Sequence, residues 1–171
     1  MTFAPGLVLL LLPTTALAAE SMPPAVDFAP GYEATLQAKY GTQEATALRS
    51  EIVDSISAAL KAAHGRCALN LDVVLERAAP SHPTMKQQLD NPALDPFRSV
   101  FLNGGAALTG HVHGADGRVL DTVKHQRFAD NRASVSAGKD PWSDARLAIG
   151  QFTDKLVNAC KRRTIAADLS H

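Results

Sequence analysis

The dipeptide Asp116-Gly117 constrains the fold more than any other feature, because it lies between two segments with the composition of strands. These segments are residues 106–113 and 118–128, and Asp-Gly in such a position is a strong signal for a β-hairpin. An earlier segment, residues 67–76, alternates apolar and polar side chains with the period of two that is typical of a strand with one buried face. We therefore expect a sheet that is rich in antiparallel pairs.

Two other segments show the spacing of amphipathic helices. Apolar residues recur at helical positions in residues 42–63 and again in residues 142–160, and charged residues occupy the other faces. Residues 32–40 fit a helix and a strand equally well. The combination predicts a single α+β domain, in which two amphipathic helices pack on one face of an antiparallel-rich sheet.

The first part of the chain has the pattern of an export signal. Residues 7–12 are uninterrupted apolar residues, and Ala16-Leu17-Ala18 follows with the small residues that signal peptidase accepts. The apolar run is shorter than the roughly 20 residues that a membrane-spanning helix needs. It is not followed by a cysteine placed to carry a lipid. We expect cleavage after Ala18 and a periplasmic protein of a Gram-negative bacterium, with no stable membrane anchor.

These patterns also divide the chain into parts. We expect a signal peptide in residues 1–18, a lead-in over 19–41, the α+β domain over 42–163 and a flexible tail over 164–171. Cys67 and Cys160 each fall on the apolar side of an expected element, and cysteines in an oxidising compartment are more often bonded than free. We therefore expect a disulfide between them, the alternative being two buried free thiols.

Three histidines suggest a metal site on the hairpin. His111 and His113 are alternate residues of one strand, so their imidazoles share a face, as zinc or copper ligands would. His125, on the partner strand, joins them only if the hairpin pairs odd with odd positions, as a three-residue loop with a left-handed Gly117 would do. A two- or four-residue turn sends His125 to the other face. The alternative is that all three are polar residues on the solvent side of the sheet.

The connection over residues 77–104 is long and rich in proline, and connections of this length are often functional. Thr84 and Gln87 predict a capping box for a short helix within it. Ser81 and Ser99 lie there beside acidic and imidazole side chains, as a hydrolase would require, but no G-x-S-x-G elbow accompanies them. Gly104-Gly105 could hold an anion, although a role in backbone geometry before the next strand explains the pair more simply.

A set of short motifs spread over residues 45–160 carries a family resemblance. The motifs are Leu71-Asp72-Val73-Val74, Ala79-Pro80-Ser81-His82-Pro83-Thr84, Gln88-Leu89, Arg98-Ser99, Gly104-Gly105-Ala106-Ala107, Asp116-Gly117 and Trp142-Ser143-Asp144-Ala145. Together they resemble uncharacterised small envelope proteins of proteobacteria, most of which are lipoproteins with domains of unknown function. This chain lacks their lipid-bearing cysteine. The resemblance implies a periplasmic α+β module, and it assigns no activity and no catalytic residues.

The function we expect from these features is a non-enzymatic binding module of the cell envelope. It would take an envelope protein or a small ligand on the loop over residues 77–104 or on an exposed sheet edge, which a second copy of the chain could also cover. The alternatives are a periplasmic zinc or copper binder that uses His111, His113 and His125, and a small hydrolase. The 17 Lys and Arg balance 17 Asp and Glu, so no strong positive field favours nucleic acid as a partner.

Overall fold

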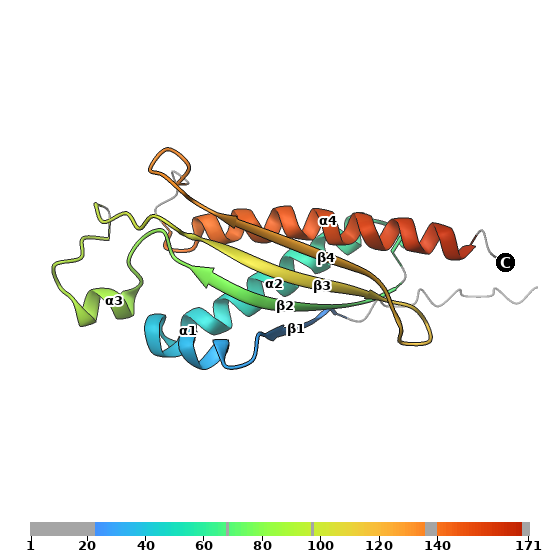
Figure 1. The fold of residues 1–171 in the computed structure, drawn as a ribbon, viewed down its shortest axis with the longest axis horizontal. Coiled ribbons are helices and arrows are strands. Elements are labelled where there is room, and N and C mark those ends of the chain that lie inside the picture. The colour runs from blue at the N-terminus through green and yellow to red at the C-terminus, as the bar shows by residue number, and fades with distance from the viewer. Residues whose placement is uncertain (1–22, 68, 97, 136–139, 169–171) are drawn as a thin grey trace, which may run out of the picture.

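The computed structural model describes residues 23–67, 69–96, 98–135 and 140–168, and its centre is a four-stranded sheet (Figure 1). The strands are β1 (Ala25–Phe28), β2 (Asn70–Ala79), β3 (Gly105–His113) and β4 (Val119–Phe128), in the spatial order β1-β2-β3-β4. The β2–β3 and β3–β4 pairs are antiparallel, whereas β1 runs parallel to β2. The fold is therefore α+β, as expected, and its sheet is mixed.

The hairpin between β3 and β4 forms at the expected dipeptide. The N–H of Gly114 donates to the carbonyl oxygen of Arg118, which leaves residues 115–117 as the loop. Gly117 has a φ of 77°, a left-handed conformation that glycine adopts without strain. The three-residue loop with a left-handed Gly117 is the first of the two turn geometries that the sequence allowed.

A β-bulge in β4 follows this loop and changes the face of the sheet to which the later side chains of β4 point. His113 pairs with Val119, but Val112 pairs with Asp121, so Leu120 is an extra residue in β4. Such an extra residue reverses the face to which every later side chain of the strand points. From Asp121 onward, β4 therefore pairs odd with even positions of β3.

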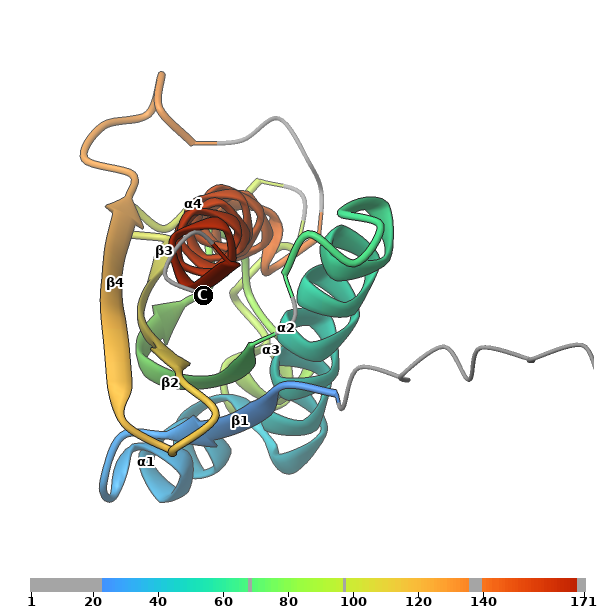
Figure 2. The same cartoon turned by 90° about the vertical axis from the view of Figure 1, so that its right-hand side faces the viewer.

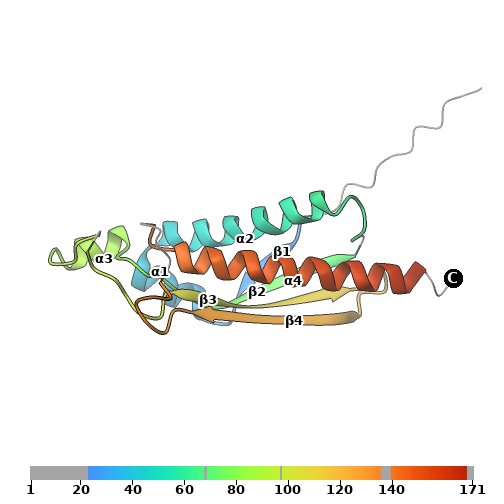
Figure 3. The same cartoon turned by 90° about the horizontal axis from the view of Figure 1, so that it is seen from above.

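Two long helices form the core together with the sheet. The helices of the described residues are α1 (Tyr32–Tyr40), α2 (Thr42–Ala62), α3 (Met85–Asp90) and α4 (Ser143–Asp168). α4 packs against β3 and β4, and α2 contacts both α4 and β1, as Figures 2 and 3 show. The side chains at the centre of the core are Leu36, Leu48, Ile52, Ile56, Val73, Leu75, Leu108, Val112, Ile149, Phe152 and Leu156.

The segment expected as a lead-in contributes two elements to this fold. β1 pairs with the first half of β2, and α1 buries Leu36 and Tyr40 in the core. Tyr40 meets Trp142 edge to face, with ring centroids 5.4 Å apart. Burial of Leu36 and Tyr40 against the core resolves the ambiguity over residues 32–40 in favour of a helix. The last helix also continues to Asp168, beyond the expected end of the domain.

A disulfide joins Cys67 and Cys160, which confirms the expected pairing. Both residues are buried, and 93 positions separate them in the sequence. The bond joins Cys67, which precedes β2 in the sequence, to the C-terminal half of α4. It therefore connects the two layers of the domain directly.

The expected signal peptide, residues 1–18, lies outside the described residues. In the part of the chain that the structure does describe, no helix combines the length and the apolar character that crossing a membrane would require. The short helix that the capping box predicted is present as α3, with both reciprocal hydrogen bonds between Thr84 and Gln87.

Candidate functional site

A second bulge, near the end of β2, determines which basic side chain reaches the surface. Alternate residues of β2 are buried up to Leu75, so continued alternation would bury Arg77. The pairing with β3 shifts between Leu75 and Arg77, and Ala78 becomes the next buried residue. Glu76 and Arg77 are both exposed. The bulge thus directs Arg77 away from the core.

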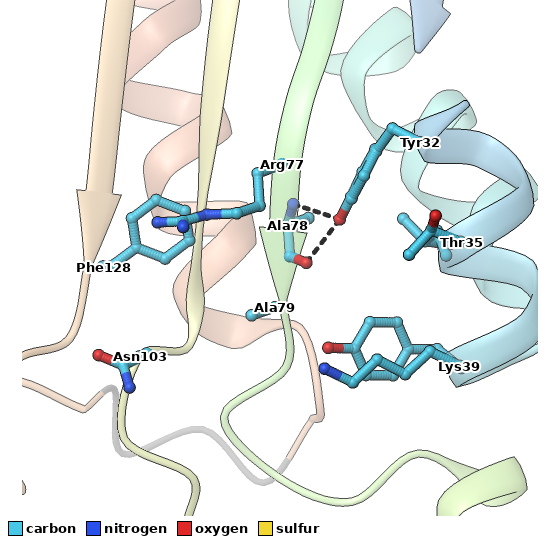
Figure 4. A pocket seen from close by; sticks show the side chains of 10 residues that line it. Tyr32, Thr35, Lys39, Arg77, Ala78, Ala79, Asn103 and Phe128 are labelled. Atoms are coloured by element: carbon cyan, nitrogen blue, oxygen red, sulfur yellow. Dashed lines mark hydrogen bonds between the residues drawn. The ribbon is translucent and has the colours of Figure 1, made fainter. Parts of the chain in front are cut away.

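Arg77 lines a hollow of about 420 Å³ between α1 and the ends of the strands (Figure 4). The lining includes Thr35 and Lys39 of α1, Arg77 and Ala79 of β2, Asn103 before β3, and Phe128 at the end of β4. These segments lie far apart in the sequence. They meet because α1 stands beside the last residues of β2, where β1 no longer pairs with it.

Tyr32 holds α1 in this position. Its hydroxyl donates to the carbonyl oxygen of Ala78 over 2.7 Å and accepts from the N–H of the same residue over 2.6 Å. Burial raises the pKa of Tyr32 above its ordinary value of 10.0, so the hydroxyl keeps the proton that it donates. One wall of the hollow is therefore fixed to the other by two hydrogen bonds.

The charged groups around the hollow are basic. The guanidinium carbon of Arg77 lies 4.2 Å from the centre of the Phe128 ring, and the ammonium of Lys39 lies 5.2 Å from the centre of the Tyr40 ring. Both arrangements are favourable cation–π contacts. No carboxylate is among the described residues that line the hollow, and neither cation forms an ion pair with a described carboxylate.

Gly104 and Gly105 allow the close packing on which the hollow depends. Gly105 has a φ of 150°, and a Cβ at this position would lie 2.0 Å from the carbonyl oxygen of Arg127 and 2.8 Å from Cα of Phe128. A Cβ at Gly104 would lie 2.4 Å from Oγ of Ser81. Both glycines therefore serve backbone geometry. Gly105 in particular permits the end of β4, with Phe128, to approach β3.

A buried polar network lies behind these glycines. Ser81 donates from Oγ to Oδ2 of Asp144 over 2.5 Å, and Arg127 donates from Nη1 to Oδ1 of the same carboxylate over 3.0 Å. Ser81 and Asp144 are fully buried. The network joins the long loop, β4 and the first turn of α4. It is a structural connection, because the Ser81 hydroxyl faces a carboxylate and is closed to any substrate.

The serines of the long loop do not meet an imidazole. Ser99 accepts the N–H of Asp95 at its Oγ over 3.1 Å, while Nδ1 of His82 contacts only the backbone carbonyl of Ser99, at 3.2 Å. A serine nucleophile needs a base on its hydroxyl. Within the described residues, neither Ser81 nor Ser99 has that arrangement.

The structure places His111 and His113 on the open face of the sheet. Their ring centroids are 6.3 Å apart. Nδ1 of His111 contacts the Thr122 hydroxyl at 3.0 Å, whereas His113 faces two acceptors, the carboxylate of Asp72 and the carbonyl oxygen of Gly117. The hydrogen bond to Asp72 is the main cause that raises the pKa of His113 above 6.5. Only the doubly protonated imidazole can donate to both acceptors.

His125 lies on the opposite face, against α4. Its Nδ1 is 2.8 Å from the Lys155 ammonium and its Nε2 is 3.2 Å from the side-chain oxygen of Gln151. Burial, followed by the charge of Lys155, lowers the pKa of His125 below 6.5. The three imidazoles therefore do not converge as the three-residue loop alone would suggest, because the bulge at Leu120 turns His125 away. In the described ranges, no group of three or more His, Cys, Asp or Glu side chains could hold a metal ion.

The residues that line the hollow were not singled out as a site by the sequence patterns. A signal was nevertheless present, because the alternation of β2 ends in the polar pair Glu76-Arg77 and resumes with Ala78. Two consecutive polar residues inside an alternating strand are typical of a bulge. Comparison with protein-family models, with curated proteins and with solved structures gave no match for this chain.

Proposed function

We propose that this chain is an exported, non-enzymatic binding module of the bacterial cell envelope, and that its ligand or partner segment occupies the hollow between α1 and the strand ends. The observation that carries the proposal is the hollow itself. Its volume of about 420 Å³ lies within the range of roughly 300–1,000 Å³ that is common for small-ligand sites. Its walls belong to α1, β2 and β4 rather than to a mobile loop, which favours a preformed site.

The side chains around the hollow support binding rather than catalysis. Arg77, Lys39 and Asn103 can hold a polar ligand through hydrogen bonds and charge, and Phe128 offers an apolar surface. The serine and imidazole groups considered for hydrolysis lie elsewhere, and Ser81 is fully buried. Arg77 and Asn103, which line the hollow, lie at the two ends of the connection over residues 77–104. This location agrees with the binding role expected for that connection.

Two features support export. The apolar run and the small residues before Ala19 have the pattern of a signal peptide. The Cys67–Cys160 disulfide is compatible with an oxidising compartment such as the periplasm. N-terminal sequencing of the protein recovered from the periplasm of a Gram-negative host tests this part, since we expect a mature chain that begins at Ala19. A chain retained in the cytoplasm with its first 18 residues would contradict it.

A fragment screen tests the binding role. We expect fragments to shift the backbone amide resonances of Arg77, Asn103 and Phe128 in the full chain, and Ala79→Trp to abolish these shifts by filling the hollow. Ala133→Trp, at an exposed position, is the matched control and should leave them unchanged. Fragments that gather at another surface, or that ignore Ala79→Trp, would argue against the hollow as the site.

A further inference from the structure

We infer that the ligand of this hollow carries an oxyanion group, a carboxylate or a phosphate, attached to an apolar body, and that Arg77 holds the oxyanion. The inference rests on the proposed function and names the chemical class of its ligand. Three observations carry it. Arg77 packs on Phe128 and has no carboxylate partner among the described residues, the side chain of Asn103 is exposed, and the helix side of the hollow offers apolar surface and the charge of Lys39.

Arg77 is prepared for an anion by its contact with Phe128. Its guanidinium lies over the ring, 4.2 Å from the ring centre to the guanidinium carbon, and Figure 4 shows the side chain extended across that ring. Packing on an aromatic ring restrains the guanidinium, while its N–H donors remain available at its edge. A restrained guanidinium can donate two parallel hydrogen bonds to a carboxylate or phosphate. No described carboxylate occupies those donors.

Asn103 supplies a second polar group on the same side of the hollow as Phe128 (Figure 4). Its backbone has a φ of 77°, and its N–H donates to the carbonyl oxygen of Ala129 over 2.8 Å, so the residue is held in place. Its side chain is exposed and makes no hydrogen bond to a described residue. The amide group is therefore available to a ligand that Arg77 has already attracted.

The helix side of the hollow provides apolar surface and a further positive charge. Leu36 and Tyr40 line that wall, and Lys39 extends from α1 toward the strand ends (Figure 4). A second cation without a carboxylate beside it raises the positive potential over the whole hollow. A ligand whose oxyanion binds Arg77 and whose apolar body points toward Tyr40 makes favourable contacts with both walls of the hollow.

Two other hollows lack this bias of charge. One, along β3 and β4, has both Glu76 and Lys124 in its lining, and another, between α2 and α3, contains Glu44 and an Asp90 that is already paired with Lys86. In each of them, an anion would meet a carboxylate as well as a cation. The observations therefore favour the hollow at Arg77 for an anionic ligand.

The test is a titration of the exported full chain, with its disulfide intact, followed through its backbone amide resonances at low ionic strength. The probes are 4-phenylbutyrate, phenethyl phosphate, the neutral 4-phenylbutanamide and inorganic phosphate. We expect at least one anionic aryl probe to bind at least fivefold more tightly than the neutral amide, and to shift Ala79, Asn103 and Phe128. The two anionic aryl probes distinguish a carboxylate ligand from a phosphate ligand.

Variants assign the effect to Arg77. Arg77→Gln should weaken the binding of the anionic probes at least fivefold and leave the binding of the neutral probe unchanged. Arg77→Lys should have an intermediate effect, because it keeps the charge but loses the paired donors. Arg118→Gln, at the other end of the sheet, is the charge-matched control and should have no effect. Arg77 is exposed, so these variants test binding rather than folding.

Each of the other outcomes would overturn one part of the inference. Equal binding of the neutral and anionic probes would overturn the oxyanion but leave the hollow as a binding site. Inorganic phosphate that binds as tightly as phenethyl phosphate would overturn the apolar body. If no probe shifts the residues of the hollow, both this inference and the proposed function fail.

Discussion

The Tyr32 hydroxyl serves both backbone groups of Ala78 at the point where β2 has lost its strand partner. β1 pairs with β2 only as far as Phe28 and Leu75, yet β2 continues to Ala79. Both polar groups of one residue point to the same edge of a strand, so a single hydroxyl can reach the N–H and the carbonyl oxygen together. A side chain of α1 thus completes the edge of the sheet, and it sets the distance between the two walls of the hollow.

We expect Tyr32→Phe to destabilise the protein, because the N–H and carbonyl of Ala78 would both lose their partner. The loss in the free energy of unfolding should be about 1–3 kcal/mol, the cost of leaving partly buried polar groups unsatisfied. Urea unfolding measures it, and hydrogen exchange of the Ala78 amide should accelerate. Tyr40→Phe is the control, since its hydroxyl bonds to no described residue. Equal stability of the two variants would show that the Tyr32 hydroxyl contributes nothing.

The buried network of Ser81, Asp144 and Arg127 leads to a second prediction. Asp144→Ala removes the acceptor for both partners and should cost about 3 kcal/mol of the free energy of unfolding, whereas Ser81→Ala should cost about 2 kcal/mol. Chemical denaturation measures both. Because the three residues form one network, the double variant should lose less than the sum of the single losses.

Glu51→Ala provides the comparison for this network. It removes an ion pair with Arg146 in which both side chains are partly exposed, so the expected change is within about 1 kcal/mol. An Asp144→Ala variant as stable as Glu51→Ala would mean that the buried network does not hold the long loop against α4.

The sequence patterns predicted the elements of this fold better than their register. The turn at Asp116-Gly117, the helices over 42–63 and 142–160 and the disulfide all follow from local periodicity and composition. The bulge at Leu120 does not, because it depends on how β4 fits against β3 and α4. That single extra residue separates His125 from His111 and His113, so the metal hypothesis depended on a feature that no local pattern sets.

The candidate hollow could not be predicted from local sequence patterns either. Its walls come from α1, β2 and β4, and only the packed structure brings Lys39, Arg77 and Phe128 to one place. The ambiguity over residues 32–40 had the same origin, since burial of Leu36 and Tyr40 against distant residues decides it. Contacts between segments far apart in the sequence leave no periodic trace in either segment.

The disulfide carries a third prediction. A bond between residues 93 positions apart restricts the unfolded chain strongly, so we expect the double variant Cys67→Ala, Cys160→Ala to lose about 2–5 kcal/mol of the free energy of unfolding. Guanidinium denaturation of the oxidised protein and the double variant measures the difference. Thiol alkylation supplies the companion test, because protein recovered from the periplasm should have no reactive thiol. A double variant as stable as the oxidised protein would contradict the prediction.

The two perturbed histidines should give opposite dependences of stability on pH. The pKa of His113 is raised by its bond to Asp72, so its contribution to stability is fully present below about pH 6.5 and is lost as the pH rises through the folded pKa. The pKa of His125 is lowered by burial, so protonation opposes folding and stability is lost as the pH falls below about 6.5.

Melting temperatures at pH 5.5 and pH 8.0 separate these effects. His113→Gln should lower the Tm relative to the unmodified protein more at pH 5.5 than at pH 8.0, because only the protonated imidazole donates to both Asp72 and Gly117. His125→Gln should reduce the loss of Tm on acidification, because it removes the group that resists protonation beside Lys155. An imidazole titration by NMR identifies each group directly. If His113 titrates below His125, the assigned protonation states, and with them the role of the Asp72 pair, are wrong.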